Sequence, residues 1–222
     1  MHYRIGTRGS KLALVQSEYV KRRMEEAYPE DTFELVIIKT TGDKVTDKPL
    51  AAIGTKGLFV KEIEEALLSG SIDMAVHSMK DMPAECATGL TFAKAWKRED
   101  CRDVLILKTA GSFSKLPSGA VIGTGSLRRA CQLAMLRPDI RFTAIRGNVD
   151  TRINKLRDDS YGLDGIVLAA AGLNRLGRSP EITEYLDPEV VIPAPAQGVL
   201  AIEAAEVNTE LLDKINALSD DN

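Results

Sequence analysis

The chain has 222 residues, of which 44% are hydrophobic, and this is enough for one large domain or two small ones with a sizeable core. Its 29 basic and 32 acidic residues give a formal net charge of -3, so no overall field attracts nucleic acid or an anionic membrane. Any anion binding must therefore come from local clusters. No segment has the apolar core of a signal peptide or the length to span a bilayer, and we expect a cytoplasmic protein with neither of those partners.

The cysteines are three in number and widely spaced, at Cys86, Cys101 and Cys131. An odd, scattered set fits a reduced intracellular protein better than a disulfide scaffold. Cys131 lies inside a predicted helix, where we expect it to be packed. His2 and His77 are the only histidines, so no zinc-ligand spacing exists and we predict no metal site.

Hydrophobic periodicity predicts alternating strands and helices in the first hundred residues. Ser10 is a plausible N-cap for the first helix, and Gly70 is a plausible C-terminal stop for the second. The alternation of strands and helices is typical of a parallel sheet with helices on its faces. The predicted strands are 3–7, 33–40 and 72–76, and the predicted helices begin after Ser10 and cover 58–68.

A charged stretch at 97–103 separates this unit from a second one of the same style, so we predict two α/β domains joined near residue 100. The proline-containing segment 192–198 is predicted to be a second linker, because two prolines interrupt any regular element. The strands predicted beyond the first linker are 104–107, 120–122, 141–145, 165–169 and 199–204, and the helices are 126–136, 149–157 and 211–218.

Basic residues follow several of the predicted strands, next to small or flexible residues. In 123–129 a Gly-Thr-Gly-Ser segment opens a helix just before Arg128 and Arg129, which predicts an anion site, and Arg146 follows the next strand. Similar clusters occur at 7–10 and 54–57. Each arginine could instead be an exposed residue paired with an acid, a contact worth ~0 to 1 kcal/mol. Four such clusters favour a polycarboxylate or phosphorylated ligand, and the absence of a Walker or dinucleotide fingerprint disfavours nucleotides.

Lys80 and Asp81 lie just past the end of a predicted buried strand, and Pro83 follows them. In an open α/β sheet, ligands bind in the crevice outside the strand ends, so Asp81 is the candidate for acid-base chemistry. The alternative is a solvated turn that Pro83 terminates. We expect His77 to be structural because it lies on the strand itself.

Several segments of the chain resemble the porphobilinogen deaminase family, also called hydroxymethylbilane synthases. They occur in the family's order along nearly all of the chain. The resemblance implies an α/β fold of two domains similar to type II periplasmic binding proteins, each a mixed, mostly parallel sheet flanked by helices and hinged by two linkers. The matching segments are 7–14, 57–62, 77–83, 123–129, 146–149, 171–177 and 197–198.

The resemblance also implies a discontinuous first domain of residues 1–98 plus 196–222, and an inserted second domain of residues 99–195. The family's third domain carries a cysteine, in a Gly-Gly-Cys context, that anchors a dipyrromethane cofactor. No cysteine of this chain has that context. We therefore expect a truncated form with little or no activity, a monomer, in which dipyrromethane is not covalently attached.

By resemblance the chain joins four porphobilinogen units head to tail on a dipyrromethane primer, with loss of ammonia at each step. Asp81 is implied as the catalytic carboxylate. The alternative function is a two-lobed binding module for a small polycarboxylate, without turnover. One basic position of the family is Ala52 here, so a role there is unsupported. The implied substrate-binding and cofactor-binding residues are Arg8, Ser10, Lys56, Lys80, Thr124, Ser126, Arg128, Arg129, Arg146, Arg152, Arg175 and Gln197.

Overall fold

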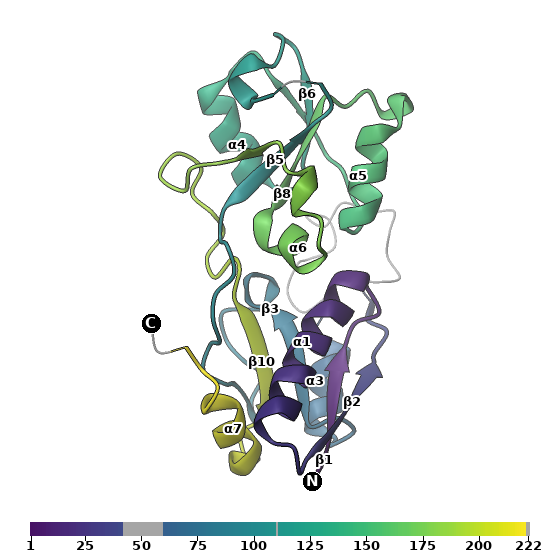
Figure 1. Cartoon of the computed structure of the whole chain (residues 1–222), viewed down its shortest axis with the longest axis vertical. Helices are drawn as coiled ribbons and strands as arrows, with labels where there is room; N and C mark the ends of the chain where they lie inside the picture. Colours follow the sequence, from purple (N-terminus) through teal and green to yellow (C-terminus); the bar gives the residue numbers. More distant parts are fainter. Residues whose placement is uncertain (42–59, 110, 221–222) are drawn as a thin grey trace. The chain divides into compact units, whose positions relative to one another are not determined.

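The computed structural model describes residues 1–41, 60–109 and 111–220 (Figure 1). The chain divides into two units, the first formed by Met1–Arg98 with Val199–Asn222 and the second by Glu99–Gly198. The backbone therefore leaves the first unit after Arg98 and returns to it at Val199. Each unit has its own sheet and its own hydrophobic core.

The sheet of the first unit has the strand order β2-β1-β3-β10-β4. β1 is parallel to both β2 and β3, whereas β10 is antiparallel to its neighbours β3 and β4. The returning segment of the chain thus occupies an interior position in this sheet. The strands are β1 (His2–Thr7), β2 (Thr32–Ile37), β3 (Met74–Ser78), β4 (Leu90–Phe92) and β10 (Leu200–Ala205).

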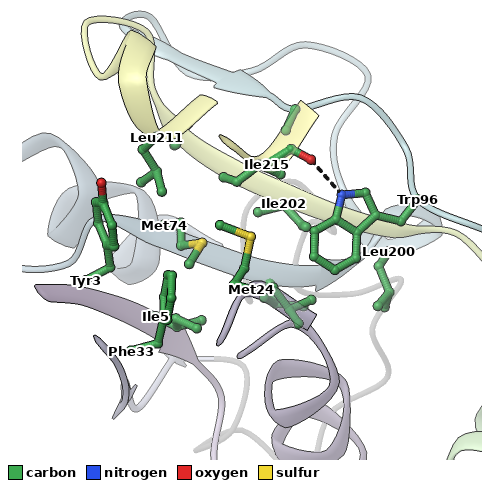
Figure 2. Packing of buried hydrophobic residues seen from close by; sticks show 14 residues of the cluster. Tyr3, Ile5, Met24, Phe33, Met74, Trp96, Leu200, Ile202, Leu211 and Ile215 are labelled. Carbon is green, nitrogen blue, oxygen red and sulfur yellow. Dashed lines mark hydrogen bonds between the residues drawn. The ribbon is translucent and has the colours of Figure 1, made fainter. Parts of the chain in front are cut away.

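Helices cover both faces of this sheet. α1 (Lys11–Ala27) and α7 (Thr209–Asn216) pack their buried residues on one face, and α3 (Lys61–Leu68) packs on the other. Figure 2 shows the first of these clusters, in which Met24 and Ile215 lie among residues of the strands. The indole N–H of Trp96 donates to the carbonyl of Ile215 at 3.0 Å, so the segment that leaves the unit is fixed to α7.

The sheet of the second unit has the order β7-β6-β8-β5-β9. β6 is parallel to β7 and β8, and β5 is antiparallel to β8 and β9. α4 (Leu127–Leu136) packs on one face, while α5 (Val149–Arg157) and α6 (Ala170–Arg175) pack on the other. The strands are β5 (Asp103–Leu107), β6 (Val121–Gly123), β7 (Arg141–Thr143), β8 (Gly165–Ala169) and β9 (Glu184–Tyr185).

The predicted class, α/β with mixed and mostly parallel sheets flanked by helices, is confirmed. Several boundaries differ. β3 begins at Met74 rather than at residue 72, because the Asp73 carboxylate accepts the backbone N–H of Arg4 at 2.7 Å and also its guanidinium. β2 ends at Ile37, and α3 begins at Lys61, while residues 58 and 59 lie outside the described part.

The structure contradicts the expectation that Cys131 is packed, since its side chain is exposed. On α4 the buried positions are Arg129 and Leu133, so Cys131 lies on the opposite face. The short elements β4, β9 and α6 were missed because two or three strand residues, or six helical ones, give too little periodicity to detect. No helix within the described ranges is long and apolar enough to cross a membrane.

Candidate functional site

The turn that carries Asp81 follows β3 directly. Residues Met79–Asp81 form one 3-10 turn, and the backbone N–H of Met79 donates to the carbonyl of Val199 at 3.0 Å. The turn closes with a bond from the N–H of Met82 to the carbonyl of Met79 at 3.1 Å. The side chain of Asp81 is exposed. The segment is therefore fixed through its backbone, and the carboxylate reaches solvent.

A cavity of about 100 Å³ lies in the first unit, between the start of α1 and the end of β3. Ser10 forms the N-cap of α1 and accepts the N–H of Ala13 at 3.3 Å, as predicted. Gln16 is 3% exposed and donates from Nε2 to Oγ of Ser78 at 3.0 Å. The cavity is lined by Arg8, Ser10, Leu12, Ala13, Gln16, Val60, Val76, His77, Ser78, Asp81 and Met82.

Gln16 lines this cavity and was not predicted from the sequence. The sequence did contain an indication of this position, because Gln16 lies on the same face of α1 as the buried apolar residues Val20 and Met24. A buried polar side chain needs a partner, and Gln16 finds one in Ser78, three residues before Asp81. The amide therefore connects the first helix to the segment that carries the candidate catalytic carboxylate.

His77 and Glu203 form a buried pair on the α3 side of the same sheet, where Ala75 also packs. Nε2 of His77 lies 3.2 Å from Oε2 of Glu203, and the side chains are 6% and 0% exposed. Neither atom of this contact has a well-directed hydrogen bond within the described residues. Burial, followed by the charge of Glu203, raises the pKa of the nearby Glu64. His77 is buried on its strand and also lines the cavity, and its structural role stays a prediction.

In the second unit, the segment before α4 uses its hydroxyl groups locally. Oγ1 of the buried Thr124 accepts the N–H of Ser126 at 3.2 Å. Oγ of Ser126 caps α4 by accepting the N–H of Arg129 at 3.4 Å. Both predicted residues therefore shape the start of the helix.

Arg128 and Arg129 converge on Asp103, the first residue of β5, which is 0% exposed. Arg129 donates to Oδ1 of Asp103 from Nε at 3.0 Å and from Nη2 at 2.7 Å, and Gln197 donates to the same oxygen at 2.8 Å. Nη2 of Arg128 lies 2.7 Å from Oδ2. Asp103 was not predicted as a site residue. We call these four side chains the Asp103 cluster.

The other predicted arginines of this unit are half-buried, and two of them hold backbone carbonyls. Arg152 donates from Nε to the carbonyl of Gly147 at 2.8 Å, at the start of α5. Arg175 donates from Nη2 to the carbonyl of Gly198 at 2.7 Å, where the chain leaves the unit. Arg146 is also half-buried and follows β7, on the segment that leads into α5.

The predicted residues therefore form two groups, one in each unit. Arg8, Ser10 and Asp81 line one cavity, and the exposed Lys80 is on the same turn as Asp81. In the second unit, the Asp103 cluster lies beside the start of α4. Lys56 lies outside the described residues, as does Ala52. Among the residues that the structure describes, no group of three or more His, Cys, Asp or Glu side chains could hold a metal ion.

The Asp103 cluster makes folding stability depend on pH. Burial alone would raise the pKa of Asp103, but the charge of Arg129, hydrogen bonds from Arg129 and Gln197, and the contact with Arg128 outweigh it and lower the pKa. A lowered carboxylate pKa gives stability that is present above the unfolded value of 3.8 and is lost as the pH falls through the folded value. Urea midpoints measured from pH 6 down to the acid limit should therefore fall below about pH 4.

The matched control for this prediction is Asp103→Asn, in which the titrating group is absent. We expect its free energy of unfolding to be lower at neutral pH and to fall less steeply in acid. Equal acid slopes for the two proteins would contradict the assignment of this pH dependence to Asp103.

Comparison with known proteins identifies the family. The model described as "Porphobilinogen deaminase, dipyromethane cofactor binding domain" matches residues 3–213. A protein from Lachnospira eligens named porphobilinogen deaminase is 97% identical over 222 residues, which are 100% of this chain and 75% of that protein. The chain belongs to the porphobilinogen deaminase family. The porphobilinogen deaminase of Clostridioides difficile is 53% identical over 223 residues, 100% of this chain and 73% of that protein.

Solved structures confirm the fold predicted for this porphobilinogen deaminase family member. The methionine-binding protein MetQ matches with a TM-score of 0.60 at 14% identity, over 98% of this chain and 89% of that chain. A VFT2 domain of BvgS from Bordetella pertussis matches with a TM-score of 0.54 at 14% identity, over 98% and 86%. The two units therefore have the fold of type II periplasmic binding proteins. At this identity the likeness concerns the fold alone.

Proposed function

We propose that this chain binds porphobilinogen and dipyrromethane and catalyses the stepwise head-to-tail condensation of four porphobilinogen units, with loss of ammonia, in heme biosynthesis. The observation that carries the proposal is the cavity of the first unit. There the exposed carboxylate of Asp81 lies with the cation Arg8 and the buried amide Gln16. Porphobilinogen has matching groups, namely a pyrrole N–H, an acetate and a propionate.

Asp81 has the chemistry that the reaction needs. Loss of ammonia from porphobilinogen leaves an electron-poor azafulvene, and a nearby carboxylate stabilises the positive charge that develops on the ring. The same carboxylate accepts and returns protons at the pyrrole nitrogen. The turn that carries Asp81 is held by the bond from Met79 to Val199 at 3.0 Å, so the carboxylate is presented from a fixed backbone.

The residues present also fit the family's dipyrromethane cofactor, which brings several carboxylates and two pyrrole N–H groups. Arg8 and Ser10 line the cavity of the first unit, and the half-buried Arg128 is 26% exposed in the second. When bound, dipyrromethane supplies the pyrrole carbon to which the first porphobilinogen is joined. In this proposal the arginines hold its carboxylates, and Lys56, Lys80, Thr124 and Ser126 assist around it.

The growing product adds an acetate and a propionate at every step, so cations must be provided for each new pair. Arg146 and Arg152 are half-buried on the segment between β7 and α5 and are proposed to receive these groups. Arginine suits this role because its planar fork can bond both oxygens of one carboxylate.

The three cysteines are free, which supports a reducing compartment and a cytoplasmic location.

The proposal is tested by mixing the chain with porphobilinogen and separately synthesised dipyrromethane. We expect ammonia release together with polypyrroles that mass spectrometry shows to grow by whole porphobilinogen units. Omitting dipyrromethane is the control and should remove the lengthened products. Tight binding of both compounds without ammonia release would contradict the proposal and favour the alternative of a binding module for polycarboxylates.

A further inference from the structure

The two arginines of the Asp103 cluster differ in the exposure and in the contacts of their side chains. The side chain of Arg129 is 8% exposed, and all three of its nitrogens are engaged, Nε and Nη2 by Asp103 and Nη1 by the carbonyl of Val167 at 3.3 Å. The side chain of Arg128 is 26% exposed, contacts Asp103 through Nη2 alone, and donates from Nη1 to the carbonyl of Ile192. Arg129 is thus fully committed inside the unit, whereas Arg128 reaches solvent.

The two contacts with Asp103 also differ in quality. Oδ1 accepts well-directed bonds from Arg129 and Gln197. Oδ2 has no well-directed donor among the described residues, although Nη2 of Arg128 lies 2.7 Å away. The Arg128 contact therefore uses a single nitrogen, whereas Arg129 engages Asp103 through two. A carboxylate arriving from solvent can approach the exposed part of the Arg128 side chain while Nη2 keeps its contact with Oδ2.

The segments where the chain enters and leaves the second unit meet at this cluster. Gln197 donates to the carbonyl of Cys101 at 2.7 Å as well as to Asp103. The residue before it, Ala196, has a φ of 55°, a left-handed conformation that is uncommon outside glycine. Such a conformation persists where the surroundings fix it. The position of Gln197 is therefore specified by its bonds to Cys101 and Asp103.

We propose that Asp103 is a positioning residue for Arg128, and that Arg129 and Gln197 hold Asp103 in place rather than contacting the ligand. A ligand carboxylate takes the solvent-facing side of Arg128, while Asp103 keeps the guanidinium oriented and offsets part of the cluster's positive charge. The inference rests on the proposed function, since the ligand is the polycarboxylate dipyrromethane. It assigns Asp103 a role and separates Arg128 from its neighbour Arg129.

The test is a double-mutant cycle on the affinity of the full chain for synthetic dipyrromethane, measured by calorimetry. Asp103→Asn is expected to weaken binding at least about tenfold, a change of about 1.4 kcal/mol. Arg128→Gln should weaken it by a similar factor or more. In the Arg128→Gln background, Asp103→Asn should have little further effect, because Asp103 acts through Arg128. Additive losses, or unchanged affinity in Asp103→Asn, would overturn the inference.

A matched control is Asp100→Asn, which removes a carboxylate paired with Arg102 three residues earlier in the same segment. Its affinity should equal that of the wild type. If Asp103→Asn does not fold, Gln197→Met replaces it, since this change removes one donor to Oδ1 together with the bond to the carbonyl of Cys101. Gln197→Met should lose less affinity than Arg128→Gln does. In the Arg128→Gln background this loss should likewise disappear. A loss that persists there would overturn the inference.

A spectroscopic readout separates positioning from a general structural effect. In nitrogen-15 spectra of the wild type, dipyrromethane should shift the Nε signal of Arg128 and leave that of Arg129 unchanged. A shift of Arg129 alone would overturn the inference while leaving the proposed ligand intact. Failure of the wild type to bind dipyrromethane at all would overturn the proposed ligand and the inference together, so the two failures are distinguishable.

Discussion

Replacing Asp81 by asparagine is expected to lower the rate of ammonia release by about 10²- to 10⁴-fold, the range typical of removing a positioned acid-base group. The side chain is exposed and its backbone turn is held by bonds that the substitution does not touch. The fold should therefore survive. The measurement is single-turnover ammonia release with porphobilinogen and dipyrromethane, together with a thermal melt of each protein.

The matched control is Asp213→Asn on α7, an exposed carboxylate on an element that does not line the cavity. It should leave both the rate and the melting temperature unchanged. Affinity for dipyrromethane should fall little in Asp81→Asn, because the arginines hold its carboxylates. A variant that folds, binds and releases ammonia at the wild-type rate would remove Asp81 from the catalytic role.

The largest expected effect on stability comes from His77→Leu. Glu203 is 0% exposed, and Nε2 of His77 lies 3.2 Å from its Oε2. Removing the side chain that faces a buried carboxyl group leaves that polar group without its partner and costs about 1 to 3 kcal/mol. The double variant His77→Leu with Glu203→Leu should recover most of that loss, since apolar replacement of a whole buried pair is often neutral or stabilising. Urea unfolding at pH 7 measures each free energy.

The chain offers an exposed pair of the same chemistry as the control. His2 lies 3.3 Å from Glu34, with side chains that are 56% and 53% exposed. Surface pairs contribute about 0 to 1 kcal/mol, so His2→Leu should change the free energy of unfolding by no more than that. Similar losses in His77→Leu and His2→Leu would contradict the assignment of burial as the cause.

Local patterns predicted most of the long elements. Helical spacing predicted α1 and α5, and the predicted cap Ser10 does accept a backbone N–H of the first turn of α1. The interior position of β10 in the first sheet could not be derived in this way. Its pairing partners lie more than a hundred residues earlier in the chain, and periodicity carries no information about such pairings.

Only part of the candidate site was predicted, because its contacts also join residues that lie far apart in the chain. Arg128 and Arg129 are adjacent in sequence and look equivalent, yet one is half-buried and the other is buried. The difference arises from Asp103, which lies 26 residues from Arg129 and 94 from Gln197 along the chain. An aspartate in a charged stretch has the pattern of a solvated residue. Only the tertiary structure reveals that it is buried among cations.

The place of β10 between β3 and β4 has a consequence for how the protein is made. During synthesis, residues 1–98 emerge from the ribosome with an incomplete sheet, because the strand that joins β3 to β4 is residues 200–205. The inserted unit can complete its own sheet before that strand arrives. Until then β3 presents an unpaired edge, which favours intermolecular strand pairing. Nascent chains should thus depend on chaperones until β10 is available.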